Sequence, residues 1–156
     1  MHMKSFLIII MVSAIFASFT GNQIARVETS ETSADLENKL TNYCFQRVEG
    51  TTKQDTSTIQ LLINGEEVTG NFNHIPFEKD SRKGTIKGIK DGDTIKALWS
   101  FMQEGMNDTL SVEFKLSDDL LLQKTFGIDQ TTGRQILTDT STFSIRYSKI
   151  DCEMLK

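Results

Sequence analysis

The sequence predicts an all-β protein, either an antiparallel barrel or a strongly curved sandwich of about eight or nine short strands. Three observations lead to this expectation. From about residue 43 onward, apolar and polar residues alternate with the period of two that a half-buried strand requires. Turn-forming Gly, Asp and Asn residues separate the alternating runs. A cysteine lies near each end of the region, and in a barrel the first and last strands are neighbours.

The first 20 residues have the order of a secretory signal peptide. Lys4 supplies a positive charge, residues 6–16 are apolar apart from Ser13, and small residues follow directly. The apolar run is about 11 residues long, whereas a membrane-spanning helix needs roughly 20. We therefore expect residues 1–20 to form a signal helix that is removed on export. An uncleaved leader is the alternative, and it would be the route by which this chain meets a membrane.

Residues 21–41 predict a polar, disordered linker. They are rich in Ser, Thr, Glu and Asn, and no period among them could bury one face of a helix or strand. This leaves residues 42–153 for the folded part. A chain of 156 residues is long enough for one such domain and too short for two domains of ordinary size.

Two hairpins are predicted in the first half of the domain. The segment TIQLLINGEEVTGNF alternates on both sides of Asn64-Gly65, a dipeptide that favours a tight turn because glycine accepts positive φ. The segment GTIKGIKDGDTIKALWSFM repeats the pattern around Asp91-Gly92. One face of its second arm comprises Ile95, Ala97, Trp99 and Phe101. Pro76 lies between the hairpins, where a loop or an edge strand tolerates it.

The second half of the domain predicts further strands. In DTLSVEFKL, apolar and polar residues alternate cleanly, which is typical of an antiparallel strand with one face in water. A turn at residues 117–119 leads into LLLQKTF, and a short strand is expected at residues 135–138. In the closing segment TFSIRYSKIDC, the residues expected on the buried face are Phe143, Ile145 and Tyr147.

The two cysteines, Cys44 and Cys152, are predicted to form a disulfide. Both follow the leader, and an even number of cysteines in an exported chain favours pairing. Closing a loop of roughly 100 residues would stabilise the fold by about 4–5 kcal/mol in the chain-entropy treatment. Two buried free thiols are the alternative. No cysteine directly follows the apolar run, so a lipid anchor is not expected there.

Several short segments occur in a distinctive order along the domain: TGNF, EKDSRKGTIKG, GDTIKALWSFMQEG and VEFKL, followed by Asp-Cys near the C-terminus. This order is similar to that in a group of uncharacterised exported proteins and lipoproteins of Bacteroidota. The resemblance covers about Cys44 to Cys152 and implies a β-rich exported domain bounded by two cysteines. It implies no particular activity. The chain departs from the lipoproteins of the group because it lacks their acylated cysteine.

The charge and composition argue against nucleic acid and metal ions as partners. The formal net charge is −4, and the basic residues are scattered among acids rather than gathered in a patch. His74 is the one histidine beyond the leader, and both cysteines are expected to be oxidised, so a transition-metal site has too few ligands. We therefore expect no metal and no other cofactor.

No arrangement of side chains predicts an enzyme. His74, Asp80 and Ser81 lie within eight residues of one another, but a catalytic triad is defined by geometry and not by proximity in sequence. The acidic residues considered as glycosidase carboxylates are Glu104, Asp108, Asp118 and Asp119. All four lie at predicted strand ends or turns, where acids face water. We expect a non-enzymatic protein.

A ligand cavity is the remaining functional hypothesis. An eight-stranded barrel, lipocalin-like in outline, either encloses one small ligand or is filled by its own side chains. The aromatic residues that would line the cavity or form the core are Trp99, Phe101, Phe114, Phe126, Phe143 and Tyr147. We expect an exported envelope protein, periplasmic or secreted, that binds a small apolar ligand. The alternative is a structural module with a filled core that contacts another envelope protein.

Two kinds of short motif are candidate glycosylation sites. Asn107-Asp108-Thr109 matches the N-glycosylation pattern. Asp93-Thr94-Ile95 and Asp108-Thr109-Leu110 resemble the Asp-Thr-aliphatic sites that carry glycans in exported Bacteroidota proteins. The candidate acceptors are therefore Thr94, Asn107 and Thr109.

Overall fold

The computed structural model describes residues 39–155 of the chain. The predicted signal helix and residues 21–38 of the predicted linker lie outside the described residues. In chain order the elements are β1 (Thr41–Glu49), β2 (Asp55–Asn64), β3 (Glu67–Ile75), β4 (Arg82–Asp91), β5 (Thr94–Gln103), β6 (Met106–Leu116), β7 (Leu120–Lys124), β8 (Gly127–Ile128), β9 (Gln135–Ile136), β10 (Phe143–Ile150) and the 3-10 helix η1 (Cys152–Leu155).

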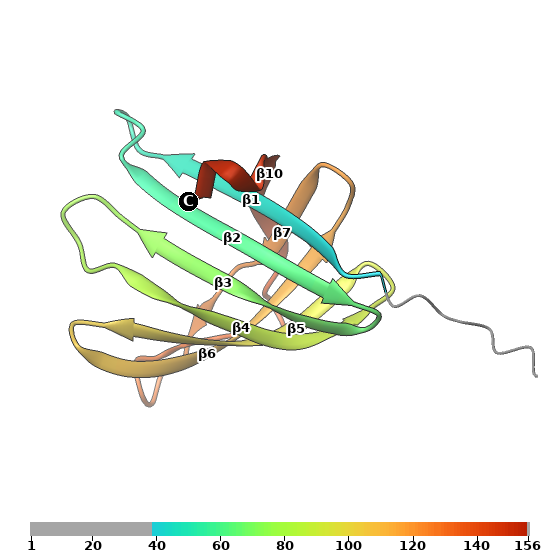
Figure 1. The fold of residues 1–156 in the computed structure, drawn as a ribbon. Coiled ribbons are helices and arrows are strands. Elements are labelled where there is room, and N and C mark those ends of the chain that lie inside the picture. Colours follow the sequence, from blue (N-terminus) through green and yellow to red (C-terminus); the bar gives the residue numbers. More distant parts are fainter. Residues whose placement is uncertain (1–38, 156) are drawn as a thin grey trace, which may run out of the picture. The chain divides into compact units, whose positions relative to one another are not determined.

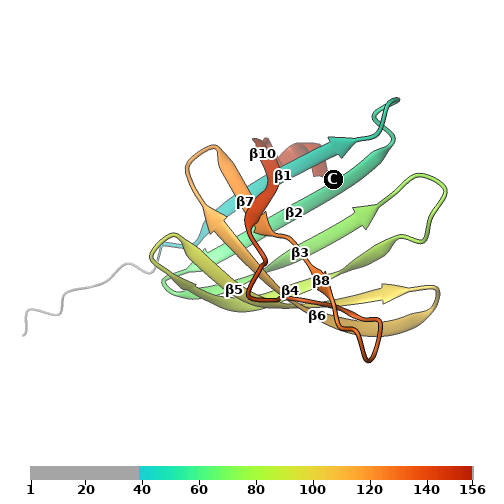
Figure 2. The ribbon, with the colours of Figure 1, turned by 180° about the vertical axis from the view of Figure 1, so that it is seen from behind.

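Eight of the strands close into an antiparallel barrel, which confirms the all-β prediction and decides for the barrel against the sandwich. Strands β1 to β7 pair one after another, and β10 closes the circle between β7 and β1 (Figure 1). Strands β8 and β9 pair with each other, in a segment that leaves the barrel between β7 and β10 (Figure 2). The short strand predicted at residues 135–138 is β9, which ends two residues earlier.

The two tight turns occur where the sequence predicts them. The β2–β3 turn contains Gly65 with a φ of 62°, and the β4–β5 turn contains Gly92 with a φ of 57°. Glycine adopts this left-handed region without the steric penalty of a Cβ atom. The pairing continues from both turns without a register shift along the whole of each hairpin. Local turn chemistry therefore sets the register of four barrel strands.

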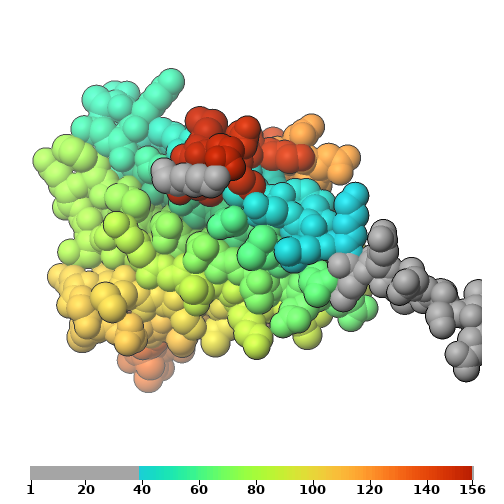
Figure 3. Space-filling view, viewed as in Figure 1, coloured from blue at the N-terminus to red at the C-terminus, as the bar shows by residue number. Residues whose placement is uncertain are grey.

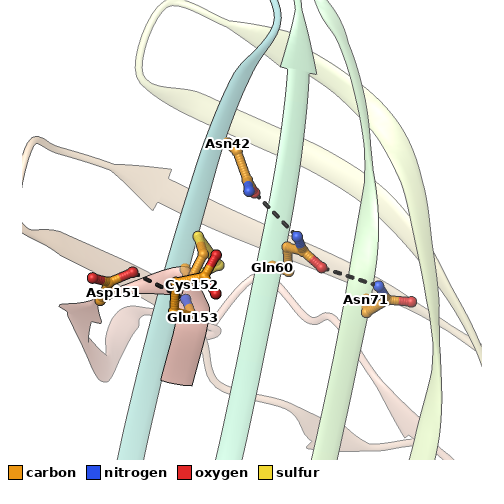
Figure 4. Close-up of a disulfide and its surroundings, with 7 residues drawn as sticks. Asn42, Gln60, Asn71, Asp151, Cys152 and Glu153 are labelled. Carbon is orange, nitrogen blue, oxygen red and sulfur yellow. Dashed lines mark hydrogen bonds between the residues drawn. A yellow bond between two sulfur atoms is a disulfide. The ribbon is translucent and has the colours of Figure 1, made fainter. Parts of the chain in front are cut away.

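The barrel closes where the first strand meets the last. Strands β1 and β10 pair antiparallel over three residues of each, with Cys44 opposite Ile150. The Cα atoms of Cys44 and Cys152 lie 5.1 Å apart, and the two residues form a disulfide on the outer face of β1 (Figure 4). Figure 3 shows η1, in red, against the cyan atoms of β1. Cys44 is buried although it faces outward, because the disulfide and η1 cover it.

Aromatic side chains fill the barrel interior. Trp99, the largest of the fully buried residues, has its ring centroid 4.1 Å from that of Phe72 and 4.4 Å from that of Phe101. Its Nε1 donates a hydrogen bond to the Phe72 carbonyl oxygen at 3.0 Å. Phe72 also meets Phe114 and Tyr147 edge-on, with centroids 6.2 Å and 6.3 Å away. These rings come from β3, β5, β6 and β10, so their contacts cross the barrel.

Gly84 on β4 lets these rings approach one another. It lies opposite Phe72 on one side and opposite Phe101 on the other. A Cβ atom at this position would lie 1.9 Å from the carbonyl oxygen of Ser100, far inside van der Waals contact. Only glycine fits where the two backbones come so close, and the aromatic residues on the neighbouring strands cover the space above it.

The outer surface differs between the two sides of the barrel. Across β1, β2 and β3 it carries a polar ladder, in which Gln60 donates to Asn42 at 3.2 Å and accepts from Asn71 at 3.3 Å (Figure 4). On β5 the outward residues Leu98 and Met102 are 47% and 54% exposed. Within residues 39–155, no helix is long and apolar enough to cross a membrane.

Candidate functional site

Polar side chains gather inside the barrel at one of its ends. We call it the long-loop end, because it carries the connections 50–54, 76–81 and 125–142 (Figures 1 and 2). Each barrel strand contributes one polar residue there, in phase with the inward-facing residues of that strand. These residues are Arg47, Ser57, His74, Arg82, Gln103, Asp108, Gln123 and Tyr147. They form a polar ring next to the aromatic core.

Hydrogen bonds connect one part of this ring to the core. Ser57 Oγ lies 2.7 Å from His74 Nδ1, across a register pair of β2 and β3. Tyr147 donates its hydroxyl hydrogen to Gln123 Oε1 at 2.7 Å, and Ser57 and Arg47 also interact with that hydroxyl. Burial raises the pKa of Tyr147, so the phenol stays neutral. In the described part of the chain, every buried side-chain nitrogen or oxygen has a hydrogen-bond partner.

The surroundings of His74 favour its neutral form. Burial lowers the pKa of the imidazole, and the positive charges of Arg82 and Arg47 lower it further. The carboxylates of Asp55 and Glu49 act in the opposite direction but do not reverse the shift. At neutral pH the ring is therefore uncharged and has one N–H donor and one acceptor nitrogen, and Nδ1 is the one engaged with Ser57.

His74 is expected to make the stability of the protein depend on pH below about 6.5. Because its pKa in the folded state is lower than the unfolded value of 6.5, the unfolded chain binds a proton first as the pH falls. The stabilising contribution is complete above the unfolded pKa and is lost as the pH falls through the folded one. Thermal unfolding between about pH 8 and about pH 5 should show a shallower decline for His74→Gln than for the wild type. Equal slopes would contradict this assignment, since His2 is the one other histidine.

Arg82, which β4 contributes to the ring, is held by neutral groups. Its Nε donates to Gln103 Oε1 at 2.7 Å, and its Nη1 donates to Gln135 Oε1 at 2.5 Å. The guanidinium carbon lies 5.2 Å from the centroid of the Phe101 ring, within the range of a cation–π contact. Gln103 comes from β5 and Gln135 from β9, so the excursion between β7 and β10 is tied to the barrel through this arginine.

Two adjoining clefts meet at Arg82 and Gln135. The larger has a volume of about 670 Å³ and is lined by His74, Pro76, Glu78, Lys79, Asp80, Arg82, Gln103 and Gln135. The smaller, of about 230 Å³, continues along β6 to Asp108 and Arg134, which form an ion pair with an N–O distance of 2.5 Å. The larger cleft falls within the size range of small-molecule sites. We call the larger one the His74–Arg82 cleft.

The aromatic residues singled out in the sequence have different places in the structure. Trp99, Phe101, Phe114 and Tyr147 are in the buried cluster, and Phe126 packs against it. Phe143 is partly buried, in the alternation expected for β10, but is not part of the cluster; the pairing of β10 with β7 shifts register between Phe143 and Ile145. The Phe143 ring lies 5.2 Å from the Lys124 ammonium. Sequence reasoning missed Phe72, although the alternation in VTGNF could have placed it inward.

The polar residues considered for catalysis are not assembled as the sequence proximity suggested. The hydroxyl beside His74 belongs to Ser57, from the adjacent strand, and not to Ser81. Asp80 lines the His74–Arg82 cleft, whereas Asp108 is paired with Arg134. Glu104 lies in the β5–β6 turn, and Asp118 and Asp119 lie in the turn at the opposite end. Residues 39–155 contain no group of three or more side chains that could hold a metal ion.

The candidate glycosylation acceptors lie on or near the surface. Asn107 and Thr109 are exposed at the start of β6. Thr94 is partly buried at the start of β5, and its hydroxyl donates to Asp93 Oδ1 at 3.1 Å. Nothing in the fold assigns a glycan to any of them.

Comparison of the chain with protein-family models, with curated proteins and with solved structures gives no match.

Proposed function

We propose that the protein is an exported, non-enzymatic binding protein that takes a small ligand in the His74–Arg82 cleft. The observation that carries this proposal is the polar ring itself. Inward positions of a barrel are usually filled by apolar residues, and here all eight strands bring polar side chains to the same end, beside a cleft of about 670 Å³. The buried members of this ring are hydrogen-bonded, so the ring is compatible with a stable fold and also offers polar groups to a ligand at its open side.

The filled interior favours this cleft over a deep apolar cavity. The rings of Phe72, Trp99, Phe101, Phe114 and Tyr147 contact one another across the barrel, in the space that an enclosed apolar ligand would need. A ligand at the long-loop end would meet His74, Arg82 and the two glutamines first. The sequence led us to expect a small apolar ligand. We propose instead that the part of the ligand that enters the cleft is polar.

The burial of Ser57, whose hydroxyl lies beside His74, favours binding over catalysis. Ser57 is 3% exposed, and its Oγ is engaged with His74 and near Tyr147. A serine nucleophile needs access to its substrate as well as an adjacent base. Ser57 lacks that access. We therefore interpret its hydrogen bond with His74 as a structural one.

Export is supported by two features of the chain. The disulfide between Cys44 and Cys152 is of the kind that persists in oxidising compartments. The N-terminal pattern of charge, apolar run and small residues predicts a signal peptide. We therefore place the protein in the cell envelope or outside the cell, in line with its resemblance to exported Bacteroidota proteins.

Native mass spectrometry of protein purified from its natural source tests the proposal. Gln103→Trp should fill the cleft, whereas Met102→Trp puts the same side chain on the outer face of the same strand. We expect the wild type and Met102→Trp to carry the same non-covalent small molecule and Gln103→Trp to have lost it. Equal occupancy in all three would place the ligand elsewhere.

The alternative function is an interaction module, and one observation favours it. Ile89 on β4 and Leu98 on β5 are 62% and 47% exposed on the outer face. If none of the three proteins carries a small molecule, and another envelope protein co-purifies until Ile89→Glu removes it, the interaction module replaces the proposed function.

A further inference from the structure

Arg82 is a cation without a carboxylate partner among the described residues. The ion pairs there are Arg47–Glu49, Lys115–Asp93, Lys124–Glu113 and Arg134–Asp108, and Arg82 takes part in none of them. Its hydrogen-bond acceptors are two side-chain amide oxygens, which orient the guanidinium but carry no formal charge themselves. A positive charge held in this way inside a cleft attracts an anion.

The geometry leaves part of the guanidinium available. A guanidinium has about five N–H donors, and the described residues accept from Nε and Nη1. Arg82 lines both adjoining clefts, and the Phe101 ring lies against it. The remaining donors suit the paired oxygens of a carboxylate or phosphate, which a planar fork binds with two parallel hydrogen bonds.

The other charges of the cleft limit the charge of the ligand. Glu78 and Asp80 line it together with Lys79, so the nearby connection adds one more negative than positive charge. The Asp108 carboxylate is paired with Arg134, and the positive charge of Arg82 also contributes to lowering its pKa. These carboxylates repel any anion, and they repel a dianion about twice as strongly as a monoanion, so the single charge of Arg82 favours a monoanion.

We infer that Arg82 binds a singly charged oxyanion of the ligand, a carboxylate in the first instance, with Gln103 and Gln135 fixing the plane of the guanidinium. This inference rests on the proposed function, because it names the chemical group that enters the His74–Arg82 cleft. The ligand class is then a small carboxylic acid whose remaining part lies towards His74 and Pro76.

A titration followed by NMR tests the inference, with sodium acetate as the probe. Acetate replaces chloride at constant ionic strength, and inorganic phosphate is titrated in the same way. We expect saturable shifts at the Arg82 Nε–H and at the side-chain amides of Gln103 and Gln135, with acetate binding more tightly than phosphate at a pH where phosphate is a dianion.

Two arginine variants provide the control. Arg82→Gln should weaken acetate binding at least about tenfold, because a charge-assisted hydrogen bond is lost. Arg146→Gln removes the same charge from an exposed position on β10 and should leave the affinity within about twofold. Shifts that persist in Arg82→Gln, or that also occur on scattered surface lysines, would overturn the inference.

The acetate titration and the test of the proposed function can fail independently. If acetate gives no shifts at Arg82, while the co-purified molecule is still lost from Gln103→Trp alone, the cleft binds a neutral ligand and only the inference fails. If Gln103→Trp keeps that molecule as well, both fail. Phosphate binding more tightly than acetate would replace the monoanion by a phosphorylated ligand.

Discussion

Replacing Trp99 by alanine is expected to lower the free energy of unfolding by about 3–5 kcal/mol. Trp99 is 2% exposed and lies between Phe72 and Phe101, so its removal leaves a cavity that neighbouring rings cannot close without leaving their own contacts. The indole hydrogen bond to the Phe72 carbonyl is lost as well. Urea unfolding followed by far-ultraviolet circular dichroism measures the change, since Trp99 is the only tryptophan and its fluorescence disappears with it.

Two variants make this prediction specific. Trp99→Phe keeps a ring in the stack and loses mainly the hydrogen bond and part of the volume, so about 1–3 kcal/mol should be lost. Leu98→Ala, the next residue on the outer face, should change stability by no more than about 0.5 kcal/mol. A loss below about 1 kcal/mol for Trp99→Ala would mean that the ring does not hold the barrel interior together.

Removing the disulfide is expected to cost about 4–5 kcal/mol, which is comparable with the whole net stability of many small domains. Cys44 and Cys152 are 108 residues apart, so the bond closes almost the entire folded part into one loop and restricts the unfolded chain accordingly. The bond also spans the seam at which β1 and β10 pair over three residues of each. That seam has less backbone pairing than the β1–β2 hairpin, which pairs along all of β1.

The measurement compares thermal and urea unfolding of the oxidised protein, the reduced protein and the double variant Cys44→Ala, Cys152→Ala. The reduced wild type and the double variant should be destabilised by similar amounts. Reductant should leave the double variant unchanged, which controls for effects elsewhere. An unchanged melting temperature after complete reduction of the wild type would show that β1 and β10 stay together without the bond.

Local patterns were enough to predict most of the strands and the two tight turns. The alternation around Leu110, Val112 and Phe114 predicted three inward residues, and all three are buried. The turns at Gly65 and Gly92 follow from the backbone freedom of one residue each. Phe143 marks the limit of this reasoning. It lies where β10 shifts register against β7, and the pairing partner is not visible in the local sequence.

The sequence by itself determined that this chain forms short antiparallel strands and where several of them turn, because those properties depend on neighbouring residues. Only the tertiary structure decided that the sheet closes and that Gln135 joins Arg82 and Gln103. In the sequence these three are ordinary polar residues near strand ends, on three separate elements. Arg82 and Gln103 meet because they lie at the matched ends of the β4–β5 hairpin, whose register follows from the turn at Gly92. Gln135 reaches them because the excursion between β7 and β10 folds back over this end, and that depends on contacts between residues far apart in the chain.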